Sequence, residues 1–243
     1  MTTEMVVQPL RPGLWRWTAP HPEWRPEKDK PGGWGESVGC VYFEPASGAR
    51  DAVVLIDPLA PPDGTPDAER FWRALDRDVE RCKVPVAILL GNHYHERSAE
   101  AIFDRYVRRP GASIWARQAA RGLVHCPVTR TFEPGDPLPG GVQAIAIHGM
   151  EETETSFLLA AHDAIVFSDA VLGAGNGRVR LAPASWAPAD AESQARYRTA
   201  FRASVARLLD LRLDSLLVSH GEIVTSGGHR ALMEALDAPA WGE

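Results

Sequence analysis

Short apolar runs, each followed directly by a polar side chain, dominate the pattern of hydrophobic and polar positions along this chain. Residues 84–90 are apolar, too few for a helix and bounded by turn residues, so we expect a buried strand there. The run stops at Gly91-Asn92, and His93 and His95 follow with one residue between them. Residues two apart in an extended chain point to the same side. The pattern therefore predicts that these two imidazoles converge on one point, as metal ligands do.

Three later apolar runs end in the same way. Residues 142–147 precede His148, residues 164–168 precede Asp169, and residues 213–219 precede His220. A catalytic zinc usually takes three protein ligands and keeps one position open. The repeated order of strand, ligand and turn therefore predicts a metal site. The carboxylates Glu151, Glu152 and Glu154 are alternative ligands if the turn after His148 is arranged differently; otherwise we expect them to form a solvated acidic loop.

The rest of the chain is predicted to alternate between strands and helices. Phe71, Leu75 and Val79 recur at helical spacing and predict a helix at residues 67–82, and Ser98 is a good N-cap for a helix at 98–107. A longer helix is predicted at residues 191–211. Further strands are expected at residues 6–10, 13–18, 38–43, 52–56 and 112–115. Residues 128–132 and 142–147 are expected in a second sheet, with a hairpin at 156–160 and 164–167.

Two long loops are predicted to flank the site. Residues 19–36 are rich in Pro and Gly and include Trp24 and Trp34, and connections of this length inside a compact domain are often functional. We expect either a flap over a pocket, with His21, Trp24 or Trp34 touching the substrate, or a loop that its tryptophans pin to the body of the protein. Residues 172–190 are predicted to be a second long loop that forms the other wall.

The order of these motifs resembles that of the metallo-β-lactamase fold superfamily. His93-Tyr-His95, His148, Ser168-Asp169-Ala170 and Ser219-His220-Gly221 follow the family's ligand order, and Asp57-Pro58 follows an early strand as in the family. The resemblance covers most of the chain, from about residue 38 to residue 221. It implies one α/β domain over residues 1–243, a four-layer αββα sandwich of two mixed sheets flanked by helices. It also implies a first metal bound by His93, His95 and His148, with Asp169 in reach.

One departure from the family motif bears on the second metal. The family carries H-x-H-x-D-H, whereas here Arg97 and Ser98 stand at the aspartate and third histidine. The resemblance implies a second site that keeps only Asp169 and His220, since arginine has no free lone pair. We hypothesise that the Arg97 guanidinium replaces the second cation and holds Asp169 or a substrate carboxylate by a bidentate pair. The alternative is an arginine turned out to solvent.

The role of Asp57 is open at this point. Its carboxylate is predicted to orient a ligand histidine, to pair with Arg97, or to cap the loop that follows.

Composition narrows the classes of partner. The chain has 243 residues, 44% of them hydrophobic, and a net charge of −6 that argues against a nucleic-acid surface. No apolar stretch is long enough to span a bilayer. Three cysteines without CxxC spacing, and a start without an apolar leader, lead us to expect a cytoplasmic protein. A small molecule is therefore the expected substrate.

These features together predict a metal-dependent hydrolase. One zinc ion would activate water against an ester, thioester, lactone or amide bond. Asp169 would orient the water or act as base, His220 would act as acid or bind the oxyanion, and Arg97 would supply positive charge. Two alternatives stay open: a mononuclear iron oxidoreductase, because two histidines and a carboxylate also suit ferrous iron, and a metal-free binding scaffold.

Overall fold

A seven-stranded sheet forms the first half of the computed structural model, which describes residues 4–240. Residues 1–3, on which part of the expectation about a leader rests, lie outside this range. The strand order along the sheet follows the chain: β1 (Val6–Arg11), β2 (Leu14–Pro20), β3 (Ser37–Phe43), β4 (Val53–Ile56), β5 (Val86–Leu89), β6 (Ala112–Arg117) and β7 (Arg130–Phe132). β1 to β4 pair antiparallel, and β4 to β7 pair parallel. The prediction that residues 128–132 join the second sheet is wrong, because β7 pairs with β6.

The second sheet has four strands in the order β13 (Ser215–Val218), β10 (Ala164–Phe167), β9 (Thr155–Leu159) and β8 (Gln143–Ala146). β9 and β10 form the predicted hairpin, and β13 lies parallel to β10. A separate two-stranded hairpin joins β11 (Val171–Gly175) to β12 (Arg178–Leu181). The prediction of one long loop at residues 172–190 is therefore wrong. Asn176-Gly177, both with positive φ, makes the hairpin turn.

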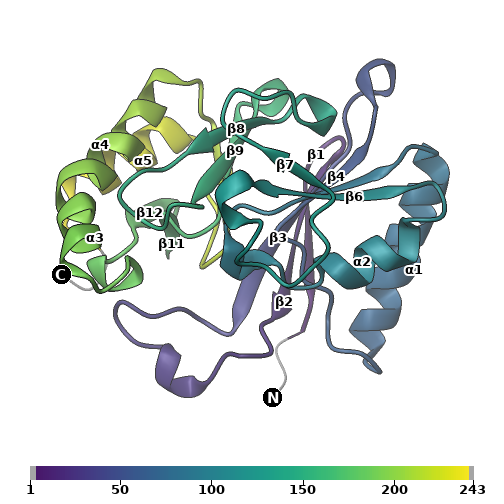
Figure 1. Cartoon of the computed structure of the whole chain (residues 1–243), viewed down its shortest axis with the longest axis horizontal. Helices are drawn as coiled ribbons and strands as arrows, with labels where there is room; N and C mark the ends of the chain where they lie inside the picture. The colour runs from purple at the N-terminus through teal and green to yellow at the C-terminus, as the bar shows by residue number, and fades with distance from the viewer. Residues whose placement is uncertain (1–3, 241–243) are drawn as a thin grey trace.

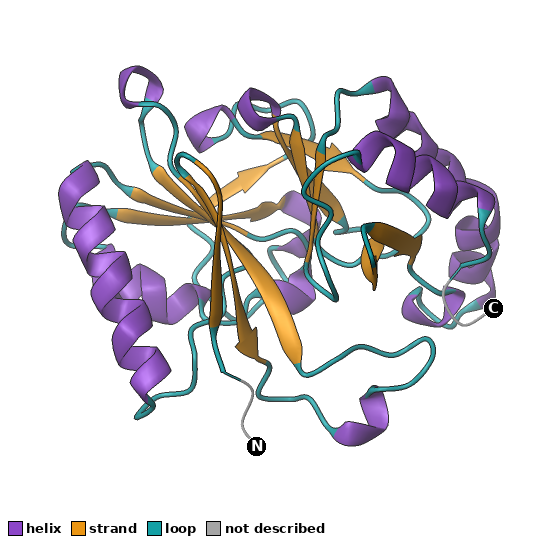
Figure 2. Cartoon of the chain, turned by 180° about the vertical axis from the view of Figure 1, so that it is seen from behind, coloured by secondary structure: helices purple, strands orange, loops and turns teal. Residues whose placement is uncertain are grey.

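Helices cover the outer face of each sheet (Figures 1 and 2). α1 (Pro66–Cys82) and α2 (Ala99–Tyr106) pack on the first sheet. α3 (Ala191–Arg196), a π-helical segment (Tyr197–Phe201), α4 (Arg202–Ala206) and α5 (Gly228–Asp237) pack on the second. The single helix predicted at 191–211 is therefore interrupted. Among the described residues, no helix combines the length and the apolar character needed to cross a bilayer.

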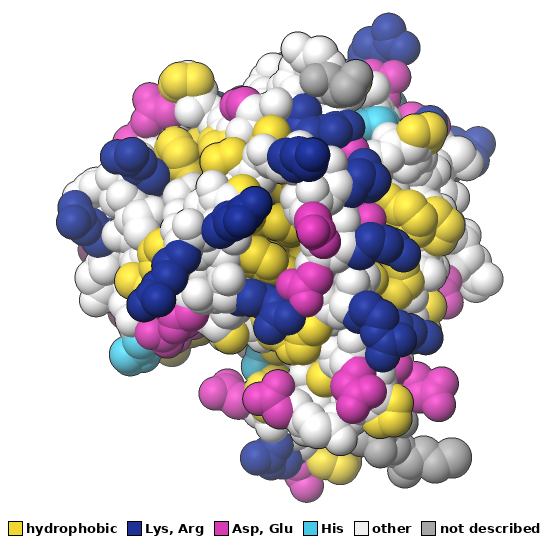
Figure 3. All heavy atoms as spheres, turned by 90° about the vertical axis from the view of Figure 1, so that its right-hand side faces the viewer, with side chains coloured by type: hydrophobic (Ala, Val, Ile, Leu, Met, Phe, Trp, Pro, Cys, Tyr) yellow, Lys and Arg dark blue, Asp and Glu magenta, His cyan; other side chains and the backbone are white. Residues whose placement is uncertain are grey.

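Three hydrophobic cores account for the layers. One lies between α1, α2 and the first sheet, one between the second sheet and α3–α5, and the third between the two sheets, where Phe132 and Phe157 pack against each other. An αββα sandwich is the arrangement that buries both faces of both sheets. The predicted fold class is confirmed. The outer face over α1 and α2 carries Lys and Arg side chains interspersed with Asp and Glu (Figure 3).

The two sheets meet at the end of β13, and this contact positions the site. The Gly39 backbone N–H of β3 donates to the carbonyl of Ser219 at 2.6 Å, and Val38 forms an isolated bridge with His220. A Cβ on Gly39 would lie 2.7 Å from both the Val218 carbonyl oxygen and the Arg16 guanidinium, so only glycine allows this approach. The carboxyl ends of β5, β10 and β13 therefore open onto one edge of the sandwich.

Candidate metal centre

His95, Asp169 and His220 meet at one point on this edge. The Asp169 Oδ1 lies 3.3 Å from the His95 Nε2 and 3.1 Å from the His220 Nε2. All three donor atoms lie within 4.8 Å of one another, and no other group of three His, Cys, Asp or Glu donors this close occurs among residues 4–240. Each of the three residues follows the strand that was predicted to deliver it. The site is thus built from β5, β10 and β13.

Asp57 fixes the orientation of the His95 ring. Its Oδ2 lies 2.8 Å from the His95 Nδ1 and accepts a 2.6 Å hydrogen bond from the Ser168 hydroxyl, while its Oδ1 accepts from the Gly91 backbone N–H at 2.7 Å. The His95 Nε2 is therefore directed at Asp169. Of the three roles considered for Asp57, orienting a histidine is the one confirmed. A carboxylate behind a histidine in this way is the usual support of a metal ligand.

Opposing charges set the protonation of the cluster. Burial and the Arg97 charge act to lower the pKa of His95, but the carboxylates of Asp169 and Asp57 on either side outweigh them and raise it to about 9. Burial lowers the pKa of His220 against the attraction of Asp169. Burial acts to raise the pKa of Asp169, yet His95 and His220 hold it well below its ordinary value. Asp169 is therefore ionised and able to attract a cation.

Asn92 and Glu154 hold Asp169 in place. The Asn92 amide Nδ2 donates to the Asp169 Oδ2 at 2.8 Å and to the Glu154 Oε2 at 3.0 Å. The Glu154 Oε1 accepts from the backbone N–H groups of Asp169 and Ala170, each at 2.9 Å. Glu154 is only 1% exposed, and burial together with the Asp169 charge raises its pKa to about 8. The solvated-loop interpretation is wrong for Glu154, and the role of Asn92 was not predicted.

The Arg97 side chain donates hydrogen bonds to backbone carbonyl groups and to a serine hydroxyl, which neither interpretation made from the sequence predicted. Its Nη1 donates to the carbonyl oxygens of Asp57 at 2.8 Å and Gly39 at 3.3 Å, and its Nη2 donates to the Ser219 hydroxyl at 2.8 Å. The same Nη2 lies 3.2 Å from the His95 Nε2. Within residues 4–240 it contacts no carboxylate oxygen, Asp169 included, and it does not turn out to solvent. Its charge nevertheless lies beside the cluster.

His93 is placed outside the donor group because the H-x-H segment is not extended. His93–His95 forms a 3₁₀ turn, capped by the Asn92 side chain, which accepts from the Tyr94 N–H at 2.9 Å. At three residues per turn, positions two apart no longer share a side. The His93 Nδ1 instead lies 2.9 Å from the Thr153 hydroxyl. The expectation that the two imidazoles point to the same side is therefore wrong, and a ligand role for His93 stays a prediction.

His148 also lies away from the cluster. Its turn packs against the π-helical segment and α4: a Cβ on Gly149 would be 2.5 Å from the Phe201 nitrogen, and the Ser204 hydroxyl of α4 accepts from the His148 N–H at 2.9 Å. The His148 side chain is exposed. The other end of the same loop, Glu154, enters the site instead. A ligand role for His148 stays a prediction without support from this arrangement.

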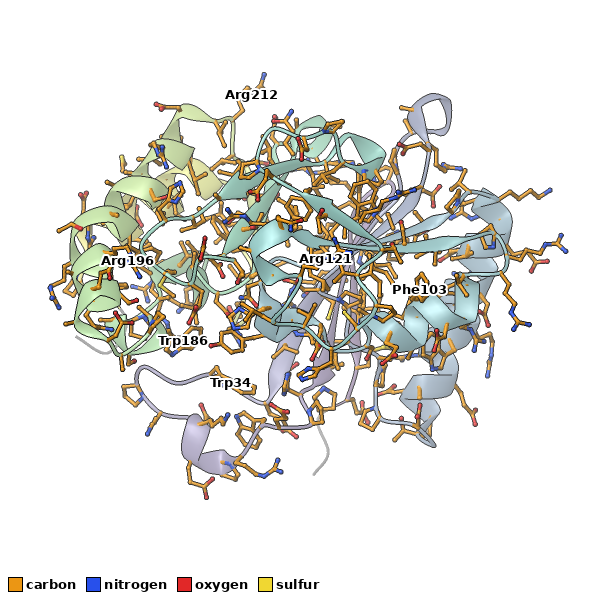
Figure 4. All side chains as sticks on the ribbon, in the orientation of Figure 1. Trp34, Phe103, Arg121, Trp186, Arg196 and Arg212 are labelled. Carbon is orange, nitrogen blue, oxygen red and sulfur yellow. The ribbon has the colours of Figure 1, made fainter. Side chains whose placement is uncertain are left out.

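A cavity of about 330 Å³ opens over the three donors. Trp34 and Trp186 form two of its walls, each with its ring centre 5.4 Å from that of His220. The Trp186 indole N–H donates to the Gly32 carbonyl at 2.7 Å, so the loop at 19–36 is joined to the opposite wall (Figure 4). Trp24 donates to the Trp34 carbonyl at 3.0 Å and does not line the cavity. The loop lines the cavity through His21 and Trp34, and Trp34 also packs against the core next to α1 and α2. Contact of the loop with a substrate stays a prediction.

Comparison with known proteins bears on the fold. Neither protein-family models nor curated proteins give a match. The solved structure of metallo-β-lactamase IND-7 matches 98% of this chain and 100% of its own, with a TM-score of 0.63 and 14% identity. A metallo-β-lactamase from Hirschia baltica matches with a TM-score of 0.62 and 13% identity over 97% of both chains. The chain has the metallo-β-lactamase fold.

A metallo-β-lactamase family protein from Thermus thermophilus agrees, with a TM-score of 0.59 and 17% identity over 94% of this chain and 80% of that one. Identities this low establish the metallo-β-lactamase fold and leave the chemistry to the residues of this chain.

The donor set of this metallo-β-lactamase fold fits one metal ion. Two imidazole nitrogens and one carboxylate oxygen are the ligand types that zinc and ferrous iron share. His95 has the supporting carboxylate of Asp57, and Asp169 has the supporting amide of Asn92. The cavity above the donors leaves room for water or substrate as a further ligand.

Proposed function

We propose that this protein is a metal-dependent hydrolase of small molecules, with one metal ion bound by His95, Asp169 and His220. The convergence of these three donors beneath an open cavity is the observation that carries the proposal. When bound, a zinc ion supplies a Lewis acid and lowers the pKa of its water toward about 7. Esters, thioesters, lactones and amides are the bonds we propose for cleavage, because each presents a carbonyl that such a centre polarises.

The residues around the donors prepare the site for this chemistry. Asp57 accepts a hydrogen bond from the Nδ1–H of His95, so that the Nε2 lone pair is the one available to the ion once Nε2 has lost its proton. Asn92 holds one oxygen of Asp169 and leaves the other directed at the two histidines. Trp34 and Trp186 flank His220 and exclude bulk water from that side. A dry, preorganised site strengthens every electrostatic contact with the substrate.

Arg97 supports a single ion rather than two. Its guanidinium is held by Asp57, Gly39 and Ser219 and lies 3.2 Å from the His95 Nε2. A second divalent ion on that side of His95 would meet this fixed positive charge at short range. We propose that Arg97 balances the buried carboxylates in place of a second cation.

Metal content in four variants tests the proposal. We expect about one zinc per chain by elemental analysis in the wild-type protein, the His93→Ala variant and the His148→Ala variant. We expect loss of zinc in His95→Ala and His220→Ala. Retention in His220→Ala together with loss in His148→Ala would show that the ligand set inferred from the sequence is right and the one proposed here is wrong.

Two further outcomes would replace the proposal. One iron per chain, with no hydrolysis of a panel of esters, thioesters, lactones and amides, would favour the oxidoreductase. No metal after dialysis against zinc would favour the metal-free scaffold. One observation favours the metal-free scaffold: both ring nitrogens of His95 already lie next to carboxylates, those of Asp57 and Asp169.

A further inference from the structure

A second cavity, of about 410 Å³, adjoins the one over the metal centre. His21, Glu23, Tyr94 and Arg97 line both, so the two cavities are direct neighbours. The side cavity extends from these shared residues toward α2 and the segment that follows β4. Nothing in the proposed chemistry uses it.

About half of the inner surface of the side cavity is apolar. Leu59 and Pro61 contribute from the segment after β4, Pro20 from the end of β2, Trp72 from α1 and Ala101 from α2. Because four separate elements supply these apolar side chains, the side cavity is a pocket between elements. An apolar cavity of about 150 Å³ holds a benzene ring. The side cavity is therefore large enough for an aromatic ring or a chain of about six carbons.

The charged residues of the side cavity disfavour an anion. The acidic residues Glu23, Asp63 and Glu96 are part of its lining. Arg97 has both terminal nitrogens bonded to the protein. Burial, with the Arg97 charge adding to it, lowers the pKa of His21 to about 4, so this imidazole is neutral near pH 7. A carboxylate or phosphate entering the side cavity would find acidic groups and no uncommitted cation among its described walls.

We propose that the side cavity is a second substrate subsite, which takes an uncharged apolar group attached to the scissile bond. The inference rests on the proposed hydrolase. It narrows the substrate class to esters, thioesters or amides with one small half over the metal donors and one apolar half, chain-like or aromatic, in the side cavity.

A matched set of esters tests this with the zinc-loaded protein. Methyl acetate is compared with hexyl acetate and with methyl hexanoate, because the apolar half can be on either side of the ester bond. We expect kcat/KM to rise by about fourfold per methylene in one of the two series. The anionic 6-acetoxyhexanoate, which matches hexyl acetate in length, should lose at least tenfold in kcat/KM relative to it.

Ala101→Trp is the variant that fills the side cavity, because Ala101 is an exposed residue of α2 on its wall. We expect it to remove the chain-length dependence and to leave the kcat/KM for methyl acetate within twofold. Ala203→Trp is the matched control, since Ala203 is exposed on α4 and lines neither cavity. Thermal unfolding of both variants verifies that they fold.

Failure of this proposal is distinguishable from failure of the hydrolase. Hydrolysis of methyl acetate, hexyl acetate and methyl hexanoate at equal kcat/KM would overturn the subsite and leave the hydrolase standing. If no ester is cleaved, binding of 1-hexanol is followed by NMR. Shifts at residues 59–62 and 98–101 that Ala101→Trp abolishes and Ala203→Trp preserves would support the subsite, and their absence would overturn it.

Discussion

At the scale of single residues, His95 depends on Asp57 for its alignment. The Asp57 carboxylate accepts three hydrogen bonds, from the Gly91 N–H, the Ser168 hydroxyl and the His95 ring. All three partners offer a proton, so the position requires an acceptor on both oxygens. An asparagine amide would place its own N–H groups against one or two of these donors. The identity of a residue that touches no substrate thus decides which nitrogen of His95 is free for a metal ion.

Asp57→Asn is therefore expected to weaken metal binding, although the two side chains have nearly the same size. Supporting residues of this kind typically account for a 10–100-fold change in metal affinity, so we expect the zinc Kd to rise by roughly that factor. Competition with a chromophoric chelator measures it. Asp104→Asn, at an exposed position of α2, is the control and should keep the wild-type Kd. An unchanged Kd in Asp57→Asn would show that Asp57 does not orient a ligand.

At the scale of secondary-structure elements, the strands that carry the donors could be predicted, whereas the turns that complete the site could not. β5, β10 and β13 are apolar runs buried on both faces, and such runs are recognisable without partners. The 3₁₀ turn at His93–His95 depends on the Asn92 cap and was not apparent from spacing. The loop at 147–154 depends on Glu154 finding buried N–H donors across the sheet. The Asn92 contact is local but does not follow from the spacing of the histidines, and the Glu154 contacts join segments that are separate in the sequence.

Helix α1 is attached to the first sheet by an ion-pair cluster that should depend on pH. The Glu44 carboxylate contacts Arg81 of α1 at 2.5 Å, forms an ion pair with Arg50, and accepts from the Tyr42 hydroxyl at 3.1 Å. Hydrogen bonds from Arg81 outweigh burial and lower the pKa of Glu44 from 4.5 to about 2. Because the folded pKa is below the unfolded one, the stabilisation is complete above the unfolded value of 4.5 and is lost as pH falls toward 2.

Glu44→Gln should reduce the free energy of unfolding at pH 7 by about 2 kcal/mol, less than the full pKa shift corresponds to, because solvent screens the half-exposed Arg81. The difference between the wild-type protein and the variant should shrink steadily between pH 4.5 and pH 2, the interval set by the two pKa values. Urea unfolding at a series of pH values measures both quantities. A difference that stays constant over this interval would mean that the Glu44 charge does not stabilise the fold.

At the scale of the whole molecule, the site lies where the two sheets join, so its geometry depends on that contact. Arg16 of β2 is 5% exposed and crosses the join. Its Nη2 donates to the carbonyl oxygens of Val218 at 3.4 Å and Gly221 at 3.1 Å, on either side of His220. Arg97 makes a second link, from the end of β5 to Ser219. Two guanidinium groups, from Arg16 and Arg97, thus tie the His220 segment to the first sheet, which supplies His95.

Replacing Arg16 by methionine keeps most of the side-chain volume and removes the donors. A buried carbonyl group left without a partner costs about 1–3 kcal/mol, and Val218 is buried whereas Gly221 is exposed, so we expect Arg16→Met to lower the free energy of unfolding by about 1–3 kcal/mol. Zinc affinity should fall as well, because His220 would no longer be held against His95 and Asp169. Urea unfolding and chelator competition measure the two effects. Arg130→Met, on the exposed side of β7, should change neither. Lower stability with unchanged zinc affinity would mean that the metal ligands keep their alignment without this link between the sheets.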